Sequence, residues 1–292
     1  MTTLLESAPS MLDFSTADAI TRRFFDPLIE TKIRNPGEAL NSLGDRYLVA
    51  GKWGADISIQ RPDDLDQTCF HFAAHSSLNG RRIRFLDVGG AIGAQTFRLA
   101  LTGAGGVLID IQDQGQAKNI ENFFPDNPNP PVTFVHGDIQ EALKDNSAIA
   151  GQKFDIFYSQ RMWSSIPYAN AQRVLRHAVS SDLFSENAAF FVSAIGLHSE
   201  IGRSYPHRKK RPSQRWSLYS PEMARKHGVT GYECLYSRKN LVQQFEKAGL
   251  DVIFSWTSSF GNPKVIAVHP SASAHVRHVV KGFAKAVRAE KR

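Results

Sequence analysis

The sequence has little cysteine and no long apolar run. Its 292 residues include two cysteines, Cys69 and Cys234, which cannot build a disulfide framework and match no metal-ligand spacing. The longest nearly unbroken apolar run, 188–197, is far shorter than the roughly 20 residues of a membrane-spanning helix. The first residues carry Glu6 and Asp13 and lack the basic start and apolar stretch of a secretory signal. We therefore expect a cytoplasmic protein without a membrane span.

The composition is that of a folded globular chain, with 42% hydrophobic and 22% charged residues. The net charge of +7 is concentrated in two segments: 201–215 holds six Lys or Arg and no acid, and 271–292 holds six Lys or Arg and one Glu. The rest of the chain is net acidic. The positive charge therefore predicts two basic patches and not a uniformly basic domain.

Short apolar runs alternate with longer amphipathic stretches from residue 83 onward. This alternation predicts strands joined by helices, hence a parallel sheet with helices on both faces. The expected strands are 83–88, 107–111, 132–135, 154–159 and 188–195, and the expected helices are 94–101, 114–123 and 169–178.

The C-terminal third predicts one more helix and two more strands. Ser237 is placed to cap a helix through about 248, and Gly249 suits the left-handed position that ends it. Two strand-like runs follow, 250–257 and 264–269, with turn-forming residues between them. We therefore predict an α/β fold with a mostly parallel seven-stranded sheet and an antiparallel C-terminal edge hairpin.

Three additions to this core are expected. Residues 1–65 are predicted to be an N-terminal helical cap over the carboxyl edge of the sheet. The main domain is predicted to span 66–270, with a long connection at 196–236 that acts as a lid. Residues 271–292 predict a basic C-terminal helix with an apolar face, formed by Val276, Val279, Val280, Phe283 and Val287.

A glycine-rich turn follows the first predicted strand. The residues at 86–93 read Leu-Asp-Val-Gly-Gly-Ala-Ile-Gly, which lets the backbone turn sharply and lets a nucleotide-type ligand approach the main chain. A dinucleotide fingerprint that starts at Gly89 would need glycine where Ala91 and Ala94 stand. The match to that fingerprint is therefore poor.

The same turn has an acid, Asp87, two residues before its first glycine. This arrangement resembles the first motif of class I S-adenosylmethionine-dependent methyltransferases, a Rossmann-like family, with Ala91 in place of the middle glycine of the motif. The resemblance assigns Asp87, Gly89, Gly90 and Gly93 to a site for S-adenosylmethionine, whose product is S-adenosylhomocysteine.

Two further acids support this resemblance. Asp110 ends the second strand, where a carboxylate can accept hydrogen bonds from both hydroxyls of a ribose, a geometry that NAD enzymes share. The run at 135–139 resembles the methyltransferase motif whose acid, here Asp138, receives the adenine amino group. Alternatively, Asp138 caps the helix that follows. The neighbouring Ile111 and Ile139 are assigned to the same cofactor site.

The fourth strand extends the resemblance, which covers roughly residues 60 to 270. The run at 154–160 resembles the fourth motif of the family, which implies that Ser159 and Gln160 lie beside the methionine part of the cofactor. Arg61, upstream of the first motif, resembles arginines that some members use to bind the cofactor carboxylate.

Several methyltransferase subclasses are disfavoured. The turn at 159–162 is not the Pro-Pro-aromatic turn of amino-methylating nucleic-acid enzymes, and neither cysteine is placed to activate a cytosine ring. No acids follow the fourth and fifth strands to hold magnesium, so no metal site is expected. The two glutamates of protein arginine methyltransferases are missing between 159 and 172. A metal-independent, small-molecule type remains.

The candidate catalytic residues lie after the fourth and fifth strands. His198 is the leading candidate for a general base, Arg161 could bind an acidic acceptor, and Tyr205 belongs to the predicted lid. The alternatives are a loop histidine bonded to backbone for His198 and a surface ion-pair partner for Arg161.

The sequence therefore predicts an S-adenosylmethionine-dependent methyltransferase that acts on an O or N atom of a small metabolite, with an acidic acceptor preferred. An RNA- or nucleotide-directed methyltransferase that uses the basic loop and the C-terminal helix is the first alternative. A binding module that has lost its chemistry is the second. The oligomeric state is left open.

Overall fold

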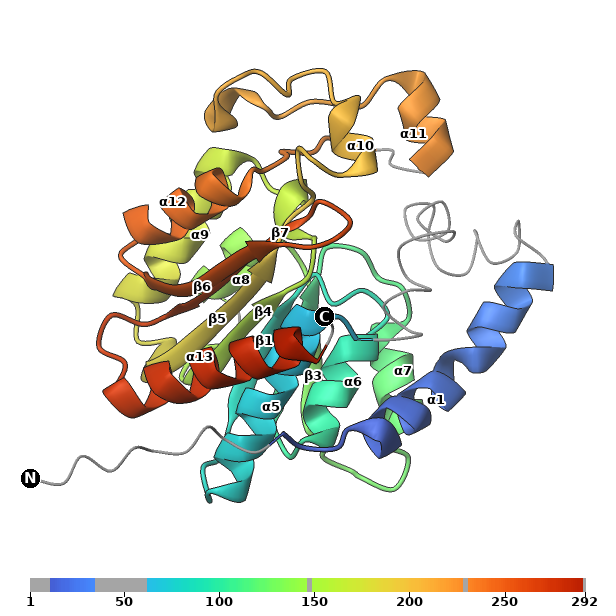
Figure 1. Ribbon diagram of the computed structural model, residues 1–292. Coiled ribbons are helices and arrows are strands. Elements are labelled where there is room, and N and C mark those ends of the chain that lie inside the picture. Colours follow the sequence, from blue (N-terminus) through green and yellow to red (C-terminus); the bar gives the residue numbers. More distant parts are fainter. Residues whose placement is uncertain (1–10, 35–61, 146–148, 228–230, 291–292) are drawn as a thin grey trace, which may run out of the picture.

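The computed structural model describes residues 11–34, 62–145, 149–227 and 231–290. The described residues form a seven-stranded sheet in the order β3-β2-β1-β4-β5-β7-β6 (Figure 1). The strands are β1 (Arg84–Val88), β2 (Gly105–Asp110), β3 (Val132–His136), β4 (Phe154–Ser159), β5 (Phe184–Ser193), β6 (Asp251–Thr257) and β7 (Pro263–Val268).

The sheet is parallel except at β7, which runs antiparallel to both β5 and β6. The expected mostly parallel sheet with a C-terminal hairpin is therefore confirmed. The reversed strand does not lie at the edge of the sheet, because β7 pairs with β5 and leaves β6 outermost.

Helices cover both faces of the sheet. The first face carries α5 (Asp64–Leu78), α6 (Ala94–Leu101), α7 (Gln116–Phe123) and α13 (Ala274–Ala289), and the second carries α8 (Ile139–Asp145), α9 (Tyr168–Ser180) and α12 (Arg238–Lys247). Because side chains alternate along a strand, neighbouring residues serve different cores. Phe85 packs on the first face and Leu86 on the second.

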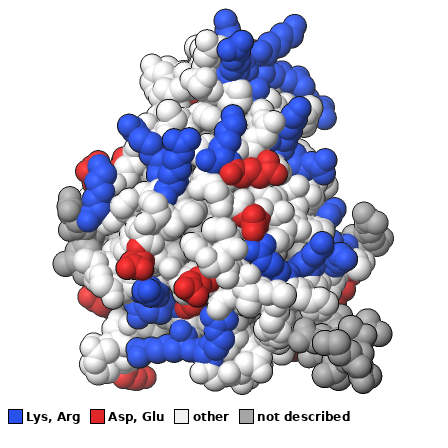
Figure 2. Space-filling model, turned by 90° about the vertical axis from the view of Figure 1, so that its left-hand side faces the viewer, with Lys and Arg blue, Asp and Glu red and all other residues white. Residues whose placement is uncertain are grey.

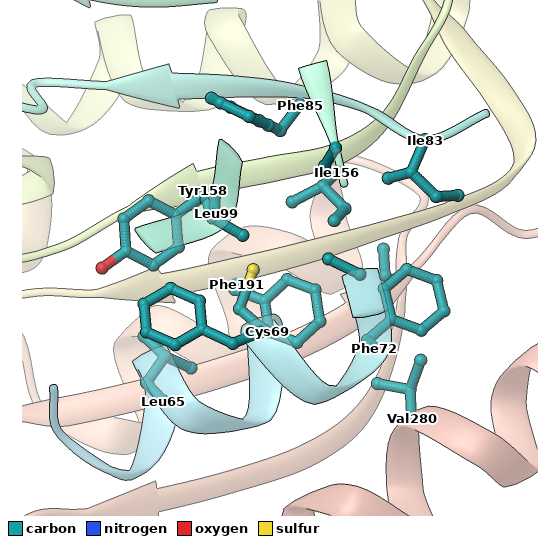
Figure 3. Close-up of a cluster of buried hydrophobic side chains, with 14 of the residues drawn as sticks. Leu65, Cys69, Phe72, Ile83, Phe85, Leu99, Ile156, Tyr158, Phe191 and Val280 are labelled. Carbon is teal, nitrogen blue, oxygen red and sulfur yellow. The ribbon is translucent and has the colours of Figure 1, made fainter. Parts of the chain in front are cut away.

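Large apolar side chains fill the core of the first face. Here α5 lies against the middle of the sheet and beside α13. Figure 3 shows side chains of α5, the strands and α13 meeting in this core, among them Leu65, Cys69, Phe72, Phe85, Ile156, Phe191 and Val280. All of these side chains are almost fully buried, and Cys69 is a packing residue within this core.

The described N-terminal helix lies beside the sheet and not over its carboxyl edge. Helix α1 (Ser15–Arg34) packs against α6, and the buried Arg98 of α6 donates to Asp18 of α1 at 2.7 Å. Helix α5 begins at Asp64, and Asp63 caps it by accepting from the backbone N–H of Leu65 at 2.8 Å. Residues 35–61 of the predicted cap are outside the described ranges.

The connection 196–236 lies beyond the carboxyl ends of the strands, as the upper part of Figure 1 shows. It contains α10 (Glu200–Arg203), η3 (Pro212–Gln214) and α11 (Pro221–His227). A small core of its own holds it together, formed by Leu197, Tyr205, Tyr219 and Leu235.

The C-terminal helix α13 packs on its own domain. Its predicted apolar residues are buried, Arg277 pairs with Asp251 of β6 at 2.7 Å, and Arg288 lies over the ring of Trp256. Within the described ranges no helix is long and apolar enough to cross a membrane.

The packing of α13 leads to a stability prediction. Phe283 is fully buried and lies against His71 and His75 of α5, so Phe283→Ala should lower the free energy of unfolding by about 3–5 kcal/mol. Lys281 is exposed on the same helix, and Lys281→Ala should change the free energy of unfolding by less than about 0.5 kcal/mol. Urea unfolding of the two variants measures the difference; equal stabilities would contradict the docking of α13.

Candidate active site

The glycine turn lies between β1 and α6 at the carboxyl edge of the sheet. Gly89 and Gly93 have φ angles of +74° and +97°, and Ala91, which replaces the middle glycine of the motif, has a φ of +52°. A left-handed conformation costs a residue with a side chain roughly 1–2 kcal/mol. The turn therefore keeps the shape that glycine normally provides, with backbone strain at Ala91.

Asp110 braces this turn from the end of β2. Its carboxylate accepts from the backbone N–H of Ala91 at 3.0 Å and from that of Gln112 at 2.9 Å. The side chain is half-buried, and the neighbouring Ile111 is 60% exposed, which leaves an apolar surface next to the carboxylate. A carboxylate has about four acceptor positions, so one carboxylate can accept from both backbone and ligand donors.

Asp138 follows β3, the strand next to β2. Its carboxylate accepts from the backbone N–H of Gln140 at 2.7 Å, which is the capping role given above as the alternative. The side chain is only half-buried at the same edge as Asp110, so a second role at the site is compatible with its position. Ile139 is buried in the core of the second face.

The sheet therefore combines three features. They are a glycine turn after β1, acids after β2 and β3, and a strand order in which β7 is reversed. The chain has the class I methyltransferase fold.

Comparisons with known proteins find solved structures that are similar to this chain at low sequence identity. The CcbJ methyltransferase from Streptomyces caelestis is 13% identical, with a TM-score of 0.49, over 80% of this chain and 98% of that one. Magnesium protoporphyrin IX methyltransferase from Synechocystis PCC 6803, with bound SAH, is 16% identical, with a TM-score of 0.47, over 70% and 84%. No family model and no curated protein matches the sequence.

The end of β4 lies next to the glycine turn. Ser159 is fully buried and its hydroxyl donates to the carbonyl of Val88 at 3.0 Å, so it holds β4 against β1. The Gln160 amide donates to Asp66 at 2.6 Å and to Asp63 at 2.9 Å, and its oxygen accepts from Ser193. Both side chains therefore hold the strand ends together in this structure.

Arg161 and Met162 complete the turn after β4. Arg161 has a φ of +62°, and its N–H donates to the Ser193 hydroxyl at 2.9 Å. The Met162 side chain packs directly against Gly89, where an added Cβ would lie 2.1 Å from the Met162 Cγ. Gly89 is therefore needed for the close approach of the β4 turn as well as for its own backbone angle.

A buried polar cluster lies beneath this turn, and sequence reasoning missed it. Asp66 of α5 accepts from the Tyr158 hydroxyl at 2.6 Å, and Lys264 of β7 pairs with Asp63 and Asp64. Burial, together with the charge of Asp63, raises the pKa of Asp66 to about 6. Two sequence signals could have indicated it: three acids at the start of one helix, and a lysine inside an apolar strand.

Asp87 is a second buried acid, at the end of β1. One carboxylate oxygen accepts from the hydroxyl of Thr96, and the side chain is 1% exposed. Burial raises the pKa of Asp87 to about 7, and the charge of Asp110 acts in the same direction. The residue therefore holds α6 against β1 from below the turn.

The other predicted site residues are placed differently. His198 is exposed, and its backbone packs against Gly261 of the hairpin that joins β6 and β7. Tyr205 lies in the core of the 196–236 connection, where its hydroxyl donates to the carbonyl of Glu233 at 2.6 Å and burial raises its pKa. This geometry gives Tyr205 a structural role and no support for a catalytic one. Arg61 is outside the described ranges.

No group of three or more His, Cys, Asp or Glu side chains that could hold a metal ion is found within the described ranges.

The contact between Gly89 and Met162 leads to a prediction with a matched control. Gly89→Ala should destabilise the fold by about 2–4 kcal/mol, because it adds a clash to the strain of a positive φ. Gly115 has a φ of +79° and nothing within 4 Å of an added Cβ, so Gly115→Ala should show the backbone cost alone, about 1–2 kcal/mol. Thermal and urea unfolding compare the two.

Adding Met162→Ala to Gly89→Ala tests the cause. It should recover some of the loss that exceeds that of Gly115→Ala, because it removes the Met162 Cγ, 2.1 Å from the added Cβ, but keeps the Met162 Cβ at 2.4 Å and the backbone strain. If the double variant is no more stable than Gly89→Ala, the contact between residue 89 and Met162 is not the cause of the loss.

The raised pKa of Asp87 leads to a pH prediction. The folded state keeps Asp87 protonated up to pH about 7, whereas the unfolded chain loses this proton near the ordinary pKa of 3.8. Stability from this group is therefore complete below about pH 4 and is lost as the pH rises through 7. Unfolding free energies measured across this range should fall for the wild type relative to Asp87→Asn. Parallel curves would contradict the prediction.

Proposed function

We propose that the protein transfers a methyl group from S-adenosylmethionine to an O or N atom of a small acceptor. The observation that carries the proposal is the contact between the Asp110 carboxylate and the backbone of Ala91. It joins an acid suited to a ribose diol with a glycine turn suited to close approach of a ligand.

The residues present fit this cofactor. Asp110 would accept from the ribose hydroxyls, the exposed Ile111 would lie along the adenine ring, and Asp138 would accept from the adenine amino group. When bound, the cofactor supplies an electrophilic methyl group. The chain's own task is then to hold the acceptor in line with it and to exclude water, since positioning supplies much of the rate.

On the acceptor side, Arg161 is the residue we assign to an anionic group. Its strained backbone is fixed at the carboxyl end of β4 by the bond to Ser193, next to the Met162 contact with the glycine turn. Strained conformations of this kind cluster at ligand sites. A guanidinium suits a carboxylate or phosphate on the acceptor. We also propose the exposed His198 as the general base.

The alternative function, an RNA- or nucleotide-directed methyltransferase, would use the basic segments 201–215 and 271–292 together. In the structure α13 packs beside α5 on the first face, whereas the basic loop contacts the start of α12 on the second. The two segments therefore do not form one surface around the proposed site.

Calorimetric titration with S-adenosylhomocysteine tests the proposal. The wild type should bind it and should not bind NAD. Asp110→Asn should weaken binding by at least about ten-fold, because the amide offers one acceptor oxygen where the carboxylate offers two.

Asp113 provides a matched control. It is an exposed acid in the next loop, and its carboxylate accepts from the backbone N–H of Gly115 at 2.9 Å. Asp113→Asn should therefore leave affinity for S-adenosylhomocysteine unchanged. Wild-type binding of NAD in place of S-adenosylhomocysteine, or equal effects of the two substitutions, would overturn the cofactor assignment.

A further inference from the structure

Three neighbouring segments on one side of the molecule are rich in basic residues, and the exposed acids Glu200 and Glu246 adjoin two of them. The segments are α9, residues 201–217, and residues 237–245 of the α12 region, and together they contain ten Lys or Arg and no Asp or Glu. Of the three, only the second overlaps a basic segment that is evident in the sequence, 201–215. We call their exposed and half-exposed cations the basic face, which consists of Arg173, Arg176, Arg203, Arg208, Lys209, Lys210, Arg211, Arg238 and Lys239.

The tenth cation, Arg215, joins these elements from within. It is 7% exposed, and its guanidinium donates to the carbonyl of Lys210 at 2.9 Å and to the side chain of Asn240 in α12 at 2.7 Å. Helix α12 packs against α9, and η3 also contacts α9. The loop is therefore fixed on the two helices, and the cations of the basic face lie on elements that contact one another.

The charges of the basic face are not neutralised within the described ranges, where none of its residues forms an ion pair with a carboxylate. Figure 2 shows Lys and Arg gathered over the upper part of this side of the molecule. Like charges held close together repel one another, and an anionic partner would relieve that repulsion. Six of the nine residues are arginines, whose planar donors match phosphate oxygens.

An aromatic pair lies at the end of the same loop. The rings of Trp216 and Tyr232 stack with centroids 5.8 Å apart, and Tyr232 is 49% exposed. The bridge between Ser217 and Glu233 holds the two strands of chain that carry these rings together. Exposed rings beside unpaired cations are the elements that bind single-stranded nucleic acid, because bases stack on the rings while the cations follow the phosphates.

We propose that the basic face binds single-stranded nucleic acid. The cations contact successive phosphates, and the outer ring of the aromatic pair, Tyr232, stacks on a base. An acidic protein would use the cations but would give the exposed aromatic ring no partner of its own. The proposal does not depend on the proposed methyl transfer, because it needs neither the glycine turn nor the cofactor.

Fluorescence anisotropy with a labelled oligouridylate of about 20 nucleotides tests the proposal at several KCl concentrations between about 50 and 200 mM. For a single strand, the slope of log affinity against log salt is about −0.7 per phosphate contact. Lys209→Ala with Lys210→Ala should therefore weaken binding by roughly ten-fold and reduce the slope by about 1.4. Arg173→Ala with Arg176→Ala should do the same, which shows that the face extends onto α9.

Lys281→Ala with Lys285→Ala is the matched control, since it removes the same charge from exposed positions of α13 on the other side of the sheet. It should leave affinity and slope unchanged. Tyr232→Ala should weaken binding with little change in slope, because stacking on the ring releases no counterions.

Three results would overturn the proposal. They are an equal loss of affinity in the α13 control, an unchanged affinity in either basic-face variant, and displacement of the oligonucleotide by polyglutamate at equal charge concentration, which would identify an acidic protein as the partner. Titration of the same variants with S-adenosylhomocysteine should match the wild type. Failure of the nucleic-acid proposal can therefore be separated from failure of the cofactor assignment.

Discussion

The ion pairs between the buried Lys264 and the half-buried acids at the start of α5 are the interactions on which the carboxyl edge of the sheet depends. They connect β7 to a helix of the first face, and Asp66 connects the same helix to β4 through Tyr158 and Gln160. A buried lysine that lost its partners would be strongly destabilising, because a charge would remain without compensation. The position of the turn after β4 therefore depends on the charges of these acids and of Lys264.

Much of the fold could be predicted from local sequence patterns. The strand at 154–159 and the helix at 94–101 have the predicted bounds, because each is a short periodic run between turn residues. The glycine turn was equally visible, since an acid and three glycines in eight residues are local information. The reversed strand was expected from hairpin chemistry, but its place between β5 and β6 was not, because strand order depends on long-range pairing.

The candidate site was less predictable where its residues meet across long distances in the sequence. Gln160 was expected beside a ligand and is bonded to acids of α5, which lie more than 90 residues earlier. Tyr205 is a candidate catalytic residue of the lid in the sequence, and in the structure it lies in the small core of the 196–236 connection. The two basic segments look alike in the sequence but lie apart in the structure. Helix α13 packs on the first face through its buried apolar side, whereas the loop 201–215 contacts α12 through Arg215.

The sequence separation of the carboxyl-edge ion pairs has a consequence for synthesis on the ribosome. Lys264 lies 200 residues after Asp64, so the acids at the start of α5 have no compensating lysine until the last two strands have emerged. Closing a loop of this length is slow compared with forming local contacts. Strands β1 to β5 can pair earlier, but the edge that carries the glycine turn reaches its final electrostatic state only when the C-terminal hairpin docks. A chain interrupted before β7 would therefore lack both these ion pairs and the packing of α13 on α5.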